Sequence, residues 1–367
     1  MKVVSDIFII GGGLAGWRAA EAAVAGGASV TLVSNGVGNS PDIHALNCPV
    51  LPEDSVEIFV EDTLSSGKYE NDRQLVEAMC RESVALKDEF AFDDTIIRPL
   101  GSTIPRCVSI RHAIGAIALG DIKKRLKDKV TVENRTVTAD EVLALRAERP
   151  DVRIIIATGG WCGKYDFSTN PGYLKGDGLL IAEALGGTVK DVDEEHVQYE
   201  PTVRVEGPRR GIPVITTLLY EGARLLNMEG AEFLPDARLN KDELSKAILS
   251  QGGYAIYDLT AVPDEKLLEC RMDLSERMIK VAPAAHSSLG GIVIDSQCHV
   301  LDKDGIAVPG VFACGEVTAG VHGLNRLGGN GGTAAMVFGT IAGREAALEV
   351  KTNDIYRHET RRITLEG

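Results

Sequence analysis

The sequence predicts an α/β fold built around a parallel sheet, and three observations carry this prediction. An apolar strand at 7–10 leads through a glycine-rich turn into an alanine-rich helix at 14–26. A second buried run, at 153–160, closes on a pair of glycines. A third, at 311–315, leads into a glycine-rich loop and an apolar helix that begins near Asn330. Strands that alternate with helices in this way form parallel sheets that bind nucleotides at the strands' carboxyl ends.

The first turn has the G-x-G-x-x-G spacing of dinucleotide-binding loops, at Gly11, Gly13 and Gly16. The first glycine permits the tight turn, the second lets a pyrophosphate approach the backbone, and the third lets helix pack on strand. The same spacing also fits a tight strand–helix turn that binds nothing. The second strand, 29–33, ends in Ser34, where the general fingerprint has an acidic residue for the ribose.

The run GVHGLNRLGGN at 320–330 precedes the last helix, whose N-terminus offers free N–H groups and partial positive charge. This run resembles the C-terminal FAD signature of the fumarate reductase/succinate dehydrogenase flavoprotein family, which includes L-aspartate oxidase and urocanate reductase. The resemblance extends over 3–67 and 150–343. It implies a Rossmann-like FAD-binding domain of the two-dinucleotide-binding type with an inserted α+β capping domain. The expected divisions are 1–200 and 284–367 for the FAD-binding domain and 201–283 for the capping domain.

The resemblance also implies how FAD is held. Membrane-bound relatives attach it to a histidine in the loop that here contains Asn39 and Ser40, so we expect FAD to be non-covalent. His44, one helical turn further on, is the alternative covalent anchor. Asp177 lies near the flavin by resemblance, or serves only as the N-cap of a helix at 179–186. The expected cofactor-binding residues are Gly11, Gly13, Leu14, Ala15, Gly16, Ser34, Asn39, Ser40, Val137, Thr158, Gly159, Asp177, Gly315, Glu316, Arg326, Gly329 and Asn330.

Within the expected capping domain, the pattern predicts a hairpin at 225–233, a helix at 241–248 and a strand at 254–258. The family binds a carboxylate-bearing alkene between this domain and the flavin. By resemblance His286 and Arg326 hold one carboxylate, which suits the rigid, permanently charged fork of arginine. The plainer alternatives are an ion pair of Arg326 with Glu316 and a structural role for His286.

The sequence departs from the family in three ways. Glu200 replaces the histidine that binds the second carboxylate. Thr216 and Leu219 fall where the proton relay has Glu and Arg. The acid-donor Arg aligns with Lys241 if one residue is inserted and with Asn240 if not, and Arg238 is also near. An anionic Glu200 would repel a second carboxylate by about 1–4 kcal/mol. A buried, unpaired Glu200 could instead be protonated and act as acid or base.

The resemblance therefore implies an FAD-dependent oxidoreductase that transfers hydride to or from a C–C or C–N bond beside a carboxylate. The departures from the family imply that its substrate is not fumarate. The expected catalytic residues are His286, Arg326, Lys241 and Glu200. Amino-acid-like or urocanate-like substrates fit them. The alternative is a flavin electron-transfer subunit that works with an iron–sulfur partner and has a degraded substrate site. A nicotinamide-dependent dehydrogenase is disfavoured by the FAD signature and Ser34.

Composition sets further bounds. At 367 residues, one large domain with an insertion fits best, and a net charge of −14 argues against nucleic-acid binding. We expect no transmembrane segment and no signal peptide. The seven scattered cysteines lack any C-x-x-C, which excludes haem attachment and iron–sulfur patterns and favours reduced thiols in the cytoplasm. The chain is expected to lack the relatives' C-terminal helical domain and N-terminal haem or flavin module, so a separate electron donor or acceptor, or the substrate itself, would exchange electrons.

Overall fold

The structure, a computed structural model, describes residues 5–234, 236–237 and 239–366, with side chains up to residue 352. Its centre is a six-stranded sheet in the order β13-β14-β6-β1-β2-β5, parallel except where β13 runs antiparallel to β14. The predicted α/β fold is therefore confirmed. The strands are β1 (Ile7–Ile10), β2 (Val30–Ser34), β5 (Val130–Asn134), β6 (Arg153–Ile156), β13 (His299–Leu301) and β14 (Ala307–Ala313).

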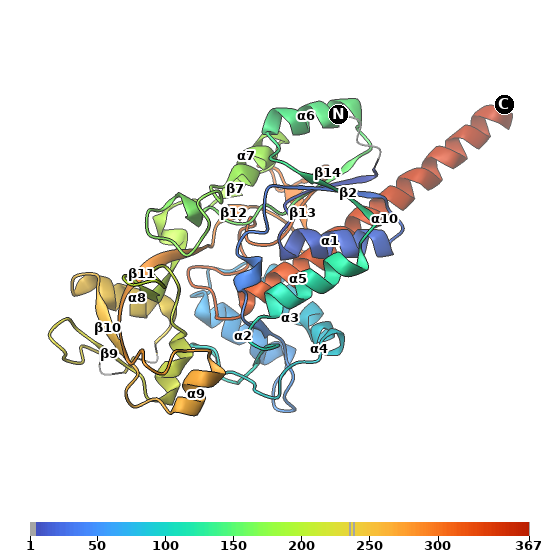
Figure 1. Cartoon of the computed structure of the whole chain (residues 1–367). Coiled ribbons are helices and arrows are strands. Elements are labelled where there is room, and N and C mark those ends of the chain that lie inside the picture. Colours follow the sequence, from blue (N-terminus) through green and yellow to red (C-terminus); the bar gives the residue numbers. More distant parts are fainter. Residues whose placement is uncertain (1–4, 235, 238, 367) are drawn as a thin grey trace.

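Helices cover both faces of this sheet (Figure 1). One face carries α1 (Leu14–Ala25), α5 (Ile114–Arg125) and α10 (Asn330–Glu366), and the other carries α6 (Ala139–Glu148) and α7 (Asp177–Ala184). The backbones of α10 and α1 cross closely, because a Cβ on Gly343 would lie 2.1 Å from the Ala19 carbonyl oxygen. The apolar helix expected near Asn330 begins there, but it runs on to Glu366 and extends beyond the body of the molecule.

Shorter elements connect these layers. The helices α2 (Val56–Ser66), α3 (Arg73–Glu82) and α4 (Leu86–Glu89) follow the first βαβ unit. Two small sheets pair β3 (Leu46–Asn47) with β4 (Cys107–Val108) and β7 (Val189–Lys190) with β12 (Gly291–Ile292). Short 3₁₀ helices lie at η1 (Ser40–Asp42), η2 (Ser83–Ala85), η3 (Cys162–Lys164), η4 (Glu194–His196) and η5 (Thr216–Glu221).

A second, antiparallel sheet has the order β8-β11-β10-β9 and carries its own apolar core. Its elements are β8 (Val197–Arg204), β9 (Arg224–Leu226), β10 (Ala255–Asp258), β11 (Met278–Ser288), α8 (Lys241–Ser250) and α9 (Asp264–Glu269). The predicted hairpin is a short one, closed by a bridge between Leu226 and Glu232. The predicted boundaries near 200 and 283 fall inside β8 and β11, the strands that continue from one half of the molecule into the other, so the division into domains stays a prediction.

Within the described ranges, no helix is both long and apolar enough to cross a membrane. All seven cysteines are free, and six of them are buried. In that same part of the chain, no group of His, Cys, Asp and Glu side chains is arranged to hold a metal ion.

Candidate active site

One cavity of about 590 Å³ lies at the carboxyl ends of the parallel strands and reaches to the antiparallel sheet. Its wall contains the loops after β1, β6 and β14, the start of α10, and side chains from β8, α8 and β11. Because the carboxyl ends of parallel strands meet at one edge, residues far apart in sequence converge there. Eighteen of the twenty expected site residues line this cavity; Gly16 and Asn330 do not.

The glycine-rich loop after β1 forms a cradle that leaves no space for side chains. Gly11 has φ +124°, and a Cβ on it would lie 2.0 Å from the Ala157 carbonyl oxygen. A Cβ on Gly16 would lie 2.0 Å from the Gly11 carbonyl oxygen, so Gly16 packs the helix against the loop and does not face the cavity. The helix α1 begins at Leu14 without a side-chain cap on its N-cap residue, and the Leu14 N–H donates to Ser40 Oγ at 2.7 Å.

Several buried polar atoms in this wall lack partners. Thr158 Oγ1 and Asn39 Oδ1 are sealed from solvent without a hydrogen bond, although Asn39 Nδ2 donates to Asn170 Oδ1 at 2.6 Å. Ser34 Oγ, in contrast, donates to the Gly36 carbonyl. Val137 is buried and lines the same cavity. Buried polar groups in native proteins are normally paired, so orphaned atoms around a cavity indicate a ligand with complementary groups.

Asp177 differs from its predicted place in the helix. The N-cap of α7 is Gly176, at φ +93°, and Asp177 is the first helical residue rather than the cap. A left-handed conformation at the cap position favours glycine over aspartate, which explains the difference. Asp177 is exposed and lines the cavity, so the alternative of a simple cap is wrong.

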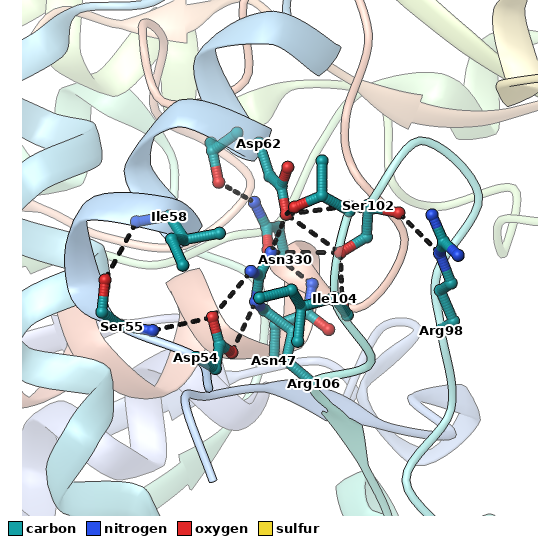
Figure 2. Close-up of polar contacts among 12 residues, drawn as sticks. Asn47, Asp54, Ser55, Ile58, Asp62, Arg98, Ser102, Ile104, Arg106 and Asn330 are labelled. Atoms are coloured by element: carbon teal, nitrogen blue, oxygen red, sulfur yellow. Dashed lines mark hydrogen bonds and ion pairs between the residues drawn. The ribbon is translucent and has the colours of Figure 1, made fainter. Parts of the chain in front are cut away.

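The N-terminus of α10 is fixed by an asparagine that the sequence analysis missed. Asn47 Nδ2 donates to Asn330 Oδ1 at 2.7 Å (Figure 2). It also donates to the Gly328 carbonyl at 2.6 Å, and Asn330 Nδ2 donates to Thr63 Oγ1 at 3.1 Å. Asn330 is therefore fully buried behind the wall, whereas Gly329, at φ +87°, lines the cavity.

Figure 2 also shows a buried ion-pair cluster next to this asparagine pair. Arg106 is fully buried and binds Asp54 through Nε and Nη2, at 3.0 and 2.9 Å, while Nη1 binds Asp62. Burial lowers the pKa of Arg106, but the two carboxylates raise it by more, so the pKa of Arg106 lies above its usual value. The cluster fixes the start of α2 against the segment that leads to β4. No local pattern in the sequence signals this cluster, because Arg106 is 52 and 44 residues away from its two partners.

Glu200 and Lys241 form an ion pair at the opposite side of the cavity. Glu200 is on β8 and its side chain is 5% exposed, whereas Lys241 is the first residue of α8 and its side chain is 17% exposed. Asn240 is the N-cap and accepts from the Glu243 N–H at 2.9 Å, so its side chain is used in the helix start. Lys241, not Asn240, therefore reaches the cavity, and Arg238 lies outside the described residues. The alternative of a buried, unpaired Glu200 is wrong, because Lys241 is its partner.

His286 lies beside this pair, with Nε2 3.9 Å from Glu200 Oε2. Its Nδ1 hydrogen-bonds Thr169 Oγ1 at 2.8 Å, which orients the ring. Burial, followed by the nearby charges of Lys241 and Arg326, lowers the pKa of His286 well below its usual range. The imidazole is thus neutral at physiological pH, so it offers hydrogen bonds rather than a charge to the cavity.

Arg326 is another cation in the cavity wall, in the loop after β14. Its Nη2 donates to Ser287 Oγ at 3.1 Å, and its Nε is buried without a partner. Glu316 instead accepts from the backbone N–H and Oγ of Ser288, at 3.0 and 3.1 Å, and burial raises its pKa. Among the described ion pairs none joins Arg326 to Glu316. The alternative of an Arg326–Glu316 ion pair is therefore not seen in the structure.

The two relay positions differ in their surroundings. Thr216 is buried in η5 and lines the cavity, whereas Leu219 belongs to the apolar core of the second sheet. Three histidines line the cavity without having been predicted as ligands of a substrate: His44, His112 and His322. Burial, followed by the proximity of His112, lowers the pKa of His44.

The comparisons with known proteins agree with this geometry. The family model described as "FAD binding domain" (FAD_binding_2) matches residues 6–147 and 122–331. The chain is 30% identical to one component of the fumarate reductase (CoM/CoB) from Methanothermobacter marburgensis, over 93% of this chain and 72% of that protein. It is 28% identical to an L-aspartate oxidase from Caulobacter vibrioides, over 94% of this chain and 76% of that protein.

Solved structures show the same relation. An open conformation of a flavocytochrome c3 fumarate reductase is 26% identical, with a TM-score of 0.73, over 94% of this chain and 78% of that one. A quinol fumarate reductase from E. coli, at 22% identity and a TM-score of 0.79, over 95% of this chain and 71% of that one, shows the shared fold. The chain thus belongs to the FAD-binding flavoprotein family of fumarate reductases, succinate dehydrogenases and L-aspartate oxidases, and it is an FAD-dependent oxidoreductase.

Proposed function

We propose that this protein transfers hydride to or from a C–C or C–N bond next to a carboxylate, on a substrate other than fumarate. One observation carries the proposal. A single cavity brings Arg326, His286 and the Lys241–Glu200 pair together opposite the glycine-rich loops that fit a dinucleotide.

The residues present fit FAD. The side-chain-free cradle at Gly11 and the orphaned polar atoms of Thr158 and Asn39 suit a ligand that approaches backbone and supplies hydrogen-bonding groups. When bound, FAD gives or takes hydride at its ring. The chain's own residues then bind, orient and protonate the substrate.

Arg326 binds the substrate carboxylate in this proposal. A guanidinium presents two parallel N–H donors to a carboxylate and stays charged even where enclosure lowers its pKa. Neutral His286 adds a hydrogen bond from the adjacent wall. These contacts orient the bond beside the carboxylate toward the cofactor loops.

Lys241 moves the proton that accompanies the hydride. Its ammonium is the donor on the cap side of the cavity, and its partner Glu200 holds that ammonium in place. The same pair sets selectivity. Since the charges of Glu200 and Lys241 cancel, the far end of the substrate meets no unpaired cation there. A neutral, hydrogen-bonding or cationic end fits, as in amino-acid-like or urocanate-like molecules.

The alternative remains a flavin electron-transfer subunit that exchanges electrons with a separate protein, with an iron–sulfur protein as the candidate. Leu219 favours it, because that relay position is filled by an apolar core residue. The relative from Methanothermobacter marburgensis is likewise named as one of the subunits of a reductase. The convergence of Arg326, His286 and Lys241 in one cavity opposes it.

The test is anaerobic reoxidation of the reduced holoenzyme by crotonate, urocanate and fumarate, followed by flavin absorbance. We expect reoxidation by at least one of the first two and slower reoxidation by fumarate. Lys241→Met should slow reoxidation, while Lys246→Met, on the same helix but paired with Asp242 at the surface, should not. Reoxidation by a one-electron dye but by no unsaturated carboxylate would support the electron-transfer subunit instead.

A further inference from the structure

His322 is a buried histidine in the cavity wall that no role described so far uses. It follows β14 in the loop that also carries Arg326, and only 9% of the residue is exposed. Its Nδ1 is sealed from solvent without a hydrogen-bond partner. Nε2 is therefore the ring atom able to reach a ligand in the cavity.

Contacts with the segment after α2 hold the backbone around His322 in place. Asn71 Nδ2 donates to the Val321 carbonyl at 2.9 Å, and the Leu324 N–H donates to the Gly67 carbonyl at 3.1 Å. Gly323 has φ +58°, and a Cβ on it would lie 2.3 Å from the Gly67 oxygen. The end of α2 thus fixes the backbone on both sides of the histidine.

The charge state of this ring is set by its surroundings. Burial, followed by the nearby positive charge of Arg326, lowers the pKa of His322 to about 3. A neutral imidazole carries one N–H donor and one acceptor nitrogen. With Nδ1 enclosed, the tautomer protonated on Nε2 points its donor at the cavity and leaves only a lone pair unpaired.

A neutral donor beside a cation is an arrangement suited to an anionic oxygen. A carboxylate has two oxygens with about four acceptor directions, more than one guanidinium fills. We propose that His322 is a substrate-binding residue that donates from Nε2 to the same carboxylate that Arg326 binds. This inference rests on the proposed function, because it requires that a carboxylate occupy this part of the cavity.

The experiment measures crotonate binding to the oxidised holoenzyme by the perturbation of the flavin spectrum, between pH 5.5 and 8. His322→Phe keeps an aromatic ring but removes the donor, and should weaken binding by about tenfold or more. His322→Gln places an amide N–H near the position of Nε2 and should recover most of that loss. The loss should not vary with pH in this range, because the ring is neutral throughout. His196→Phe is the matched control at a histidine outside the cavity and should bind like the wild type.

The outcomes separate this inference from the proposed function. If the wild type does not bind crotonate at any concentration tested, the proposed function loses its carboxylate site, and this inference falls with it. If the wild type binds, Arg326→Gln weakens binding and His322→Phe does not, only the present inference is overturned. It is also overturned if His322→Phe loses FAD while the remaining holoenzyme keeps its crotonate affinity, since the ring would then serve the cofactor.

Discussion

The two walls of the cavity are built by different means. The wall on the parallel sheet is shaped by backbone: Gly11, Gly315 and Gly329 have positive φ, and a Cβ at Gly11 or Gly329 would collide with its neighbours. The wall on the antiparallel sheet is shaped by charged side chains, chiefly Glu200 and Lys241. The first wall suits the large cofactor that the whole family shares, and the second can be changed by single substitutions. A wall made of side chains can therefore change the ligand that it fits while the fold stays the same.

The largest effect should come from filling the backbone wall. Gly11→Ala forces a side chain into a left-handed conformation and places Cβ 2.0 Å from the Ala157 oxygen, so we expect loss of FAD and at least about 3 kcal/mol of stability. Gly120→Ala is the control, because this exposed glycine of α5 has no atom within 4 Å of a built Cβ. It should stabilise the helix by about 0.5–1 kcal/mol. If the Gly11→Ala protein keeps its FAD, the backbone around Gly11 and Ala157 can move enough to accept a Cβ, which would contradict this prediction.

FAD should be held by this wall without a covalent bond. Asn39 is hydrogen-bonded to Asn170, and Ser40 accepts from Leu14, so neither replaces the attachment histidine of the membrane-bound relatives. Precipitation of the purified yellow protein with acid should release all of the flavin into the supernatant. Flavin that stays in the pellet on a peptide containing His44 would contradict this, since His44 lines the same cavity.

The next largest effect should come from Arg326, a charged residue where the two walls of the cavity meet. Arg326→Gln removes the cation from the substrate carboxylate and should weaken carboxylate binding by more than about 2 kcal/mol. FAD content should change less than affinity, measured by titration of the flavin spectrum. If affinity is unchanged, Arg326 has a structural role through Ser287, its hydrogen-bond partner.

The wall on the antiparallel sheet can be tested by removing the negative charge of Glu200, which leaves Lys241 without its partner. Wild-type protein should bind fumarate and succinate poorly, because Glu200 cancels the cation of Lys241. Glu200→His, or Glu200→Gln as the smaller change, should tighten dicarboxylate binding by at least about 1 kcal/mol. Turnover need not follow, since Thr216 and Leu219 still supply no relay. Glu195→Gln removes an exposed acid outside the cavity and should leave binding unaltered. Tight dicarboxylate binding by the wild type would show that the pair opens for such a ligand.

The same contrast decides how much could be predicted from sequence. The strands, the glycine spacing and the start of α10 follow from local patterns, and the structure confirms them. The partner of Glu200 could not be predicted, because Lys241 is 41 residues away and meets it only when α8 packs on β8. Asn47 and Arg106 were missed for the same reason, since their partners lie in other elements. Asp177 was misplaced by one position because a left-handed Gly176 outweighs an aspartate's preference for the cap.

The smallest expected effect is a pH dependence of the free energy of unfolding, and it comes from a histidine of the parallel-sheet half. His299 Nδ1 is 2.9 Å from Asp295 and its Nε2 is 3.5 Å from Glu349, and these hydrogen bonds raise the pKa of His299 to about 9. Since the folded-state pKa exceeds the unfolded value near 6.5, this stabilisation is complete below about pH 6.5 and is lost as pH rises through 9. Because the His299 side chain is 18% exposed and Glu349 also pairs with Arg153, we expect a loss of only about 1 kcal/mol.

Urea unfolding at pH 6.5 and 9.5 measures this loss of stability. His299→Asn should remove this part of the slope, whereas His196→Asn should keep it. If the two variants show equal slopes, His299 does not couple proton binding to the stability of the sheet.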